Sequence, residues 1–133
     1  SRELDPEFFG DVTDSLFVQQ GHRVVMLYST ECRFCRMSAK KLSSMIRRHN
    51  LPTESFYAVF MDMGERSDSL IEAFFGANGS IHLPYTTLNA RTLLKSTNGV
   101  LPLILLMDGD SVVEECNYRC IDESEVREFL LNR

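Results

Sequence analysis

The sequence predicts a single α/β domain with a mixed central β-sheet and helices on both of its faces. Three observations support this fold class. Apolar runs typical of buried strands alternate with helical patterns through the first half of the chain. Asp108 and Gly109 then separate two strand-like runs, which is a strong hairpin signal. The 133 residues suit one domain, residues 1–133, and contain no repeat or low-complexity linker.

The first elements follow from local patterns along the chain. Residues 10–23 are typical of a turn and a short helical or irregular segment that stops at Gly21. Residues 24–28 form a continuous apolar run, as expected for a strand covered on both faces. The next helix ends before Pro52, which cannot continue it. Its apolar side chains fall near one face at helical spacing, and they are Phe34, Met37, Leu42, Met45 and Ile46.

Capping and turn residues delimit the later elements. Asn89 is the expected N-cap of a short helix that stops at Gly99. Asp122 and Glu125 have the spacing of a capping box at the start of the last helix. The remaining elements are a strand over 55–63, a helix over 65–79, an extended piece over 81–89, a helix over 89–99, strands over 102–107 and 111–116, and a helix over 122–133.

Charge and hydropathy argue against two broad classes. A net charge of −5 disfavours a general nucleic-acid binder, and no apolar stretch reaches the ~18 residues that a membrane span needs. Because the chain starts with Ser and without a signal-peptide pattern, we expect a processed product or a piece of a longer protein. The charge is also uneven, which indicates either a solvated helix face or positive charge around a cysteine pair. The stretch from Cys32 to Thr53 holds six basic residues and no acidic one, namely Arg33, Arg36, Lys40, Lys41, Arg47 and Arg48.

Two cysteines, Cys32 and Cys35, lie where the first central strand gives way to the basic helix. A helix N-terminus carries about half a positive charge, which favours a thiolate there, and Arg33 and Arg36 add to this effect. Cys32 is closer to the helix end and more exposed, so it is the expected nucleophile. Cys35 lies one turn inside, where it can resolve a mixed disulfide. The spacing therefore predicts a redox dithiol.

Two other readings of this pair stay open. A zinc knuckle would need a second pair of ligands, and the candidates for it are Cys116, Cys120 and three scattered histidines. Alternatively, Cys32 and Cys35 are two inert cysteines that happen to lie close together. Four cysteines are too few for a scaffold built from disulfides.

Three stretches carry a resemblance to a known family, and they occur in the expected order. They are GDVTDSLFVQQGHRVVMLYSTECRFC, IHLPYTTLNARTLLKSTNGVLP and LPLILLMDGDSVVE. Over nearly its whole length the chain resembles the thioredoxin superfamily, and the TlpA-like extracytoplasmic branch in particular. It is more weakly similar to the thioredoxin-like domains of DoxX-type membrane proteins. The resemblance implies the thioredoxin fold and a thiol-disulfide oxidoreductase that needs no metal and no organic cofactor.

The resemblance also implies roles, partners and a location. Cys32 matches the attacking cysteine, Cys35 the resolving cysteine, and Pro102 the cis-proline that faces the pair. The backbone at Leu101 would hydrogen-bond an extended substrate chain, and Arg33 with Phe34 would complete the substrate-binding residues. The implied partners are protein thiol or disulfide substrates and a redox partner protein. The implied location is the periplasm or another part of the extracytoplasmic cell envelope, with a membrane tether outside this chain. Without the resemblance, Pro102 merely starts a strand.

Two departures from thioredoxins keep a rival function open. Met26 stands near the place of a buried acid, so a proton acceptor for Cys35 must come from elsewhere, such as Glu31 or water. Glu31 itself stands where a Trp is usual. The rival is a non-catalytic module of the same fold that binds or senses through the groove around Pro102. A peroxidase-like protein is a third possibility, but it would need a different arrangement around the attacking cysteine.

The second cysteine pair, Cys116 and Cys120, follows the last predicted strand. One hypothesis makes the pair an auxiliary disulfide, or lets Cys120 exchange with Cys32. The other places Cys116 in the sheet and makes Cys120 a small loop residue. We favour the second interpretation.

Overall fold

The computed structural model describes residues 2–3, 8 and 21–132 of the chain. The segment expected over 10–20 therefore lies outside the described residues. No helix in the described part is long and apolar enough to cross a membrane.

A six-stranded mixed sheet in the order β1-β6-β5-β2-β3-β4 forms the centre of the structure. Strands β2, β3 and β4 pair in parallel, whereas β5 and β6 form an antiparallel hairpin beside β2. The short strand β1, which the sequence did not predict, pairs antiparallel with the edge of β6. The strands are β1 Arg2–Glu3, β2 His22–Tyr28, β3 Phe56–Met61, β4 Tyr85–Leu88, β5 Leu103–Asp108 and β6 Ser111–Cys116.

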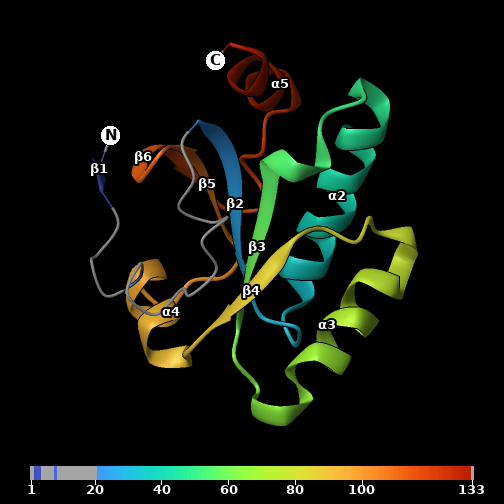
Figure 1. The fold of residues 1–133 in the computed structure, drawn as a ribbon, viewed down its shortest axis with the longest axis vertical. Helices are drawn as coiled ribbons and strands as arrows, with labels where there is room; N and C mark the ends of the chain where they lie inside the picture. Colours follow the sequence, from blue (N-terminus) through green and yellow to red (C-terminus); the bar gives the residue numbers. More distant parts are fainter. Residues whose placement is uncertain (1, 4–7, 9–20, 133) are drawn as a thin grey trace.

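Helices cover both faces of this sheet, as predicted. Figure 1 shows α2 and α3 on one side of the sheet and α4 on the other, with α5 at one end. In the continuous described part, residues 21–132, the α-helices are α2 Arg33–His49, α3 Ser67–Gly76, α4 Ala90–Thr97 and α5 Glu123–Leu131. Short 3-10 turns lie at η1 Thr53–Ser55, η2 Gly64–Arg66 and η3 Ala77–Gly79.

The continuous apolar run of β2 is explained by two cores, one on each face of the sheet. Alternate residues of a strand point to opposite faces. Met26 and Tyr28 accordingly pack with residues of α2, α3 and α5, whereas Val25 and Leu27 pack with Leu93 of α4. All four of these β2 side chains are buried, so neither face of the central strand meets solvent.

An aromatic cluster consolidates the core beneath α3. Phe60 of β3 meets Phe74 edge-on, with ring centroids 5.0 Å apart, and meets Phe75 edge-on at 5.6 Å. The ring of Tyr28 lies 5.7 Å from that of Phe60 and 5.5 Å from that of Phe74. Edge-to-face pairs contribute about 0.5–1.5 kcal/mol each beyond the burial of their area. This cluster anchors the end of β2 that leads to the first cysteine pair.

Helix α2 begins and ends close to the predicted positions, but not all of its apolar side chains lie on the buried face. The helix ends at His49 because Asn50 adopts a left-handed conformation with φ of 50°, before Pro52 is reached. Phe34 and Met37 are 41% and 45% exposed, whereas the other three apolar side chains at helical spacing are buried. The buried face of the helix combines small and larger side chains, which are Cys35, Ser38, Ala39, Leu42, Ser43, Met45 and Ile46.

The predicted caps and the hairpin are confirmed. The Asn89 side chain accepts a hydrogen bond from the Thr92 amide at 2.9 Å, and α4 ends at Asn98, which is left-handed. The Asp122 carboxylate caps α5 by accepting from the Glu125 amide at 3.1 Å. The β5–β6 turn contains Gly109 with φ of 61°, a conformation that favours glycine.

Most of the basic residues of α2 bind other parts of the protein. Arg48 donates to both carboxylate oxygens of Glu123 at 2.7 Å, and His49 lies 2.6 Å from one of them. The hydrogen bond from Arg48, and then that from His49, lowers the pKa of Glu123. Three other basic side chains donate to backbone carbonyls: Arg36 to Thr30, Lys41 to Ile121 and Arg47 to Gly79. These hydrogen bonds hold α2 against its neighbours. Arg33 and Lys40 are exposed on the surface of the helix.

Candidate active site

The loop after β2 places Cys32 at the N-cap of α2. The Cys32 amide donates to the Ser29 carbonyl at 3.2 Å, which turns the chain into the helix. The Cys32 sulfur then accepts a hydrogen bond from the Cys35 amide at 3.2 Å. A sulfur atom in this position receives the free N–H groups and the partial positive charge of the helix end. The half-buried Cys32 thiol therefore has the setting of a nucleophile.

Cys35 lies one turn inside the helix and is fully buried. Its sulfur accepts a hydrogen bond from the Ser29 amide at 3.5 Å. Burial, followed by the interaction with Cys32, raises the pKa of the Cys35 thiol well above its usual range. Both cysteines are free thiols in the structure. The two sulfurs thus differ sharply, since one is accessible and the other is protected and held protonated.

The loop before β5 brings Leu101 and Pro102 to the same place. The Leu101–Pro102 peptide bond is cis, and the Pro102 side chain is buried. The Cys32 thiol faces the Leu101 carbonyl at a sulfur–oxygen distance of 3.9 Å, although 69 residues separate them in sequence. The structure therefore brings Cys32, Cys35, Leu101 and Pro102 together.

The floor of the site is apolar and holds no carboxylate from β2. Met26, which the family resemblance places near a buried acid of thioredoxins, is fully buried among core side chains. Tyr28 forms a buried hydrogen bond with Ser38 at 2.8 Å, and burial raises the pKa of Tyr28 far above its usual value. A phenol that stays protonated cannot take the proton of Cys35. Glu31 is exposed at the rim, next to Cys32 in sequence.

The second cysteine pair forms a disulfide between Cys116 and Cys120, so the interpretation favoured from the sequence is wrong. Cys116 ends β6, and the chain turns back because the Cys120 amide donates to the Asn117 carbonyl at 3.3 Å. This turn brings the two Cα atoms to 5.6 Å, a separation that a disulfide spans. The sequence separation alone did not reveal this turn.

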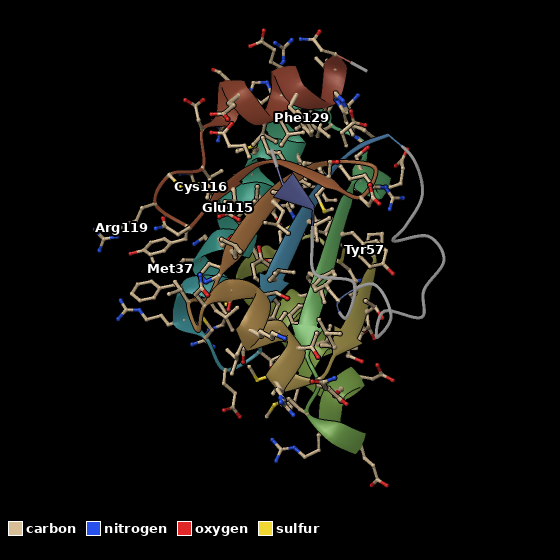
Figure 2. The ribbon with its side chains drawn as sticks, turned by 90° about the vertical axis from the view of Figure 1, so that its left-hand side faces the viewer. Met37, Tyr57, Glu115, Cys116, Arg119 and Phe129 are labelled. Carbon is tan, nitrogen blue, oxygen red and sulfur yellow. A yellow bond between two sulfur atoms is a disulfide. The ribbon has the colours of Figure 1, made fainter. Side chains whose placement is uncertain are left out.

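Tyr118, which the sequence analysis missed, lies against Phe34, one of the two residues between Cys32 and Cys35. Its ring stacks on that of Phe34 with centroids 4.5 Å apart and planes 15° apart. The Arg119 guanidinium lies 5.6 Å from the centre of the Tyr118 ring and donates from Nε to the Tyr118 hydroxyl at 3.1 Å. Figure 2 shows Met37, Cys116 and Arg119 on the same side of the molecule. The sequence feature that could have identified Tyr118 was its position between Cys116 and Cys120.

The predicted dipeptide between the cysteines is accessible to a partner. Arg33 and Phe34 are both exposed, and Phe34 forms part of the aromatic surface just described. No group of three or more His, Cys, Asp or Glu residues within the described ranges is arranged to hold a metal ion.

Comparison with known proteins gives structural matches only. No family model and no curated protein matches the sequence. Among solved structures, the thioredoxin domain of a thiol-disulfide oxidoreductase from Bacteroides vulgatus matches with a TM-score of 0.62 and 18% identity, covering 98% of this chain and 92% of that one. The chain has the thioredoxin fold.

Two further structures with the thioredoxin fold are similar. A secreted Mycobacterium tuberculosis disulfide oxidoreductase, homologous to E. coli DsbE, has a TM-score of 0.59 and 17% identity over 90% of this chain and 87% of that one. StoA from Bacillus subtilis has a TM-score of 0.60 and 15% identity over 84% and 83%. The predicted fold is thereby confirmed, whereas the link to DoxX-type proteins stays a prediction.

Proposed function

We propose that this protein is a thiol-disulfide oxidoreductase that exchanges the Cys32–Cys35 dithiol and disulfide with protein partners. One observation carries the proposal. An accessible Cys32 sulfur accepts the Cys35 amide at a helix N-terminus, and a buried, protonated Cys35 lies directly behind it. Dithiol exchange requires this division between an attacking and a resolving sulfur. The similar oxidoreductases of the same fold support it.

Exchange would proceed in two displacements at sulfur. The Cys32 thiolate attacks one sulfur of a substrate disulfide, forms a mixed disulfide and releases the other substrate sulfur as a thiolate. Cys35 then loses its proton and attacks the Cys32 sulfur, which closes the Cys32–Cys35 disulfide and releases the second substrate thiol. Two electrons pass to the substrate, and the reverse sequence oxidises it. Glu31 at the rim or water would accept the Cys35 proton.

The substrate chain would lie across Leu101 and Pro102. The Leu101 backbone lies beside the Cys32 sulfur, where its polar groups can bind an extended chain during the attack. Phe34 and Arg33 would contact side chains that flank the substrate cysteine. No organic cofactor or metal enters these steps, because all the chemistry takes place between sulfur atoms.

The proposed location is extracytoplasmic. A disulfide such as Cys116–Cys120 is typical of a protein from an oxidising compartment. One similar structure is of a protein described as secreted. A redox partner protein that regenerates the Cys32–Cys35 pair, and a membrane tether outside this chain, complete the proposal.

Insulin reduction tests whether the protein turns over. With dithiothreitol as the electron source, catalytic amounts of the protein should shorten the lag before the insulin B chain precipitates. The matched control is the double variant C116S/C120S, which keeps the Cys32–Cys35 pair and should retain this activity. A precipitation time equal to that with dithiothreitol alone would favour the rival reading, a binding or sensing module without turnover.

A further inference from the structure

We propose that Cys116 and Cys120 form a second redox couple that receives electrons from the Cys32–Cys35 dithiol within the same molecule. The proposal rests on the nucleophilic role proposed above for Cys32. It assigns a redox function to the second disulfide, which would accept electrons within the molecule. This function is in addition to any structural role of the disulfide as a cross-link between β6 and the loop before α5.

The two cysteine motifs face each other through the residues that they enclose. Phe34 lies between Cys32 and Cys35, and Tyr118 lies between Cys116 and Cys120. Their rings stack with centroids 4.5 Å apart. A stack between the middles of two short cysteine loops holds both loops side by side on one surface.

The backbone brings the two pairs to the same edge of the core. Cys32 and Cys116 both pack, partly buried, against the core cluster on the α2 side of the sheet. Cys116 stands opposite Ile104 in the β5–β6 register, and Leu101, three residues earlier in the chain, contacts the Cys32 sulfur. Cys32 and Cys116 therefore lie on either side of the chain segment that enters β5.

The second disulfide is open to attack. Cys120 is exposed, and residues 117–120 lie outside helices and strands. A cavity of about 20 Å³ lies beside the disulfide, and such a space holds about one water molecule. Its lining includes Cys116, Cys120, Ile104, Ile121 and Val126. The exposed Cys120 and this adjacent space leave the disulfide accessible to an attacking thiolate.

The transfer balances within the molecule. The Cys32 thiolate attacks the exposed Cys120 sulfur, which breaks the Cys116–Cys120 bond, forms a Cys32–Cys120 disulfide and releases Cys116 as a thiolate that takes a proton from water. Cys35 then gives up its proton and attacks Cys32, which breaks that bond and releases Cys120. Two electrons and, through water, two protons pass from the first pair to the second, so no external oxidant is needed.

Disulfide mapping of half-reduced protein tests the transfer. Fully oxidised protein receives one equivalent of dithiothreitol and is desalted, then samples are quenched with acid and alkylated at intervals. The expected result is that molecules with free Cys116 and Cys120 accumulate as molecules with free Cys32 and Cys35 decline, at a rate independent of protein concentration. Tyr118→Ala should slow this conversion about 2–10-fold, the range expected for the loss of one aromatic stack.

Two cysteine variants define the route. Cys35→Ser should accumulate a Cys32–Cys120 cross-link within the monomer, because the resolving sulfur is missing. In Cys32→Ser only dithiothreitol itself can reduce Cys116–Cys120, so free Cys116 and Cys120 should stop accumulating once dithiothreitol is removed. The rate at which Cys32 reacts with a small aromatic disulfide is measured alongside.

The outcomes separate this proposal from the proposed function. One outcome is that Cys32 reacts with the small disulfide while Cys116–Cys120 stays intact in every half-reduced molecule. In that case the second pair is a structural disulfide only, and this inference is overturned. If Cys32 does not react at all, both proposals fail.

Discussion

Replacing Cys35 with serine in the C116S/C120S protein should turn the protein from a catalyst into a trap for its substrates. Cys32 would still attack a substrate disulfide, but no buried sulfur would follow to break the mixed disulfide. Insulin reduction should fall by about 10³-fold or more, in the range reported for the loss of a covalent catalytic group. The measurement is the rate of insulin reduction together with non-reducing gel analysis, which should show protein–insulin adducts that dithiothreitol releases.

Cys32→Ser is the matched control for this prediction. It removes the accessible sulfur and leaves the buried one, so it should lose the activity without forming adducts. Adducts of equal yield in Cys32→Ser, made in the same C116S/C120S background, would show that Cys35 is the nucleophile, contrary to the geometry at the start of α2. Thermal unfolding of both variants would verify that they are folded.

The two thiols of the reduced protein should differ by about 100-fold or more in alkylation rate at neutral pH. Cys32 is half-buried at the helix end, whereas Cys35 is fully buried. The raised pKa of Cys35 keeps its sulfur in the protonated thiol form, which does not react with alkylating reagents. Brief iodoacetamide treatment of C116S/C120S protein, followed by peptide mass analysis, measures the ratio. In urea the two sites should react at similar rates.

The sign of the pH dependence follows from the same raised pKa. In the unfolded chain Cys35 ionises near its usual pKa of about 8.5, whereas in the folded protein it stays protonated well above that value. Its contribution to stability is therefore complete below about pH 8.5 and is lost as the pH rises toward the folded-state pKa. Relative to Cys35→Ala, the reduced protein should lose stability between pH 8.5 and 10. If the free energy of unfolding changed with pH equally in the two proteins, the burial of this thiol would be contradicted.

Local patterns were sufficient to predict most of the elements. Strand β2 has an unbroken apolar run, and the N-caps Asn89 and Asp122 are side chains that bind the exposed amides of a first helical turn. Strand β1 could not be predicted, because two residues carry no periodicity. Its pairing depends on the exposed edge of β6, a feature of the assembled sheet.

The exposure of Phe34 and Met37 could not be predicted from helical spacing alone, for a similar reason. Helical spacing identifies a set of apolar residues, but the width of the buried face depends on how closely the helix approaches the sheet. Small residues such as Ser38 and Ala39 form that contact, so Phe34 is left for the loop that carries Tyr118.

The pairing of Cys32 with Cys35 at a strand–helix junction was predictable from their spacing. The approach of Leu101 to Cys32 was not, because the two are far apart in sequence, and only the family resemblance implied it. The Cys116–Cys120 disulfide depends on a turn at Asn117, and the stack of Tyr118 on Phe34 depends on the position of that turn. These long-range contacts place the loop that carries Tyr118 beside Phe34.

The central claim is that Cys32 and Cys35 form a redox couple, and a glutathione redox titration tests it most directly. The C116S/C120S variant isolates this couple, and alkylation with mass analysis counts its free thiols at each potential. The account predicts a single two-electron transition from two thiols to none, with a midpoint between about −270 mV for a reductant and about −120 mV for an oxidant. A protein that keeps both thiols, or neither, at every potential would contradict the account and leave a binding module with the thioredoxin fold.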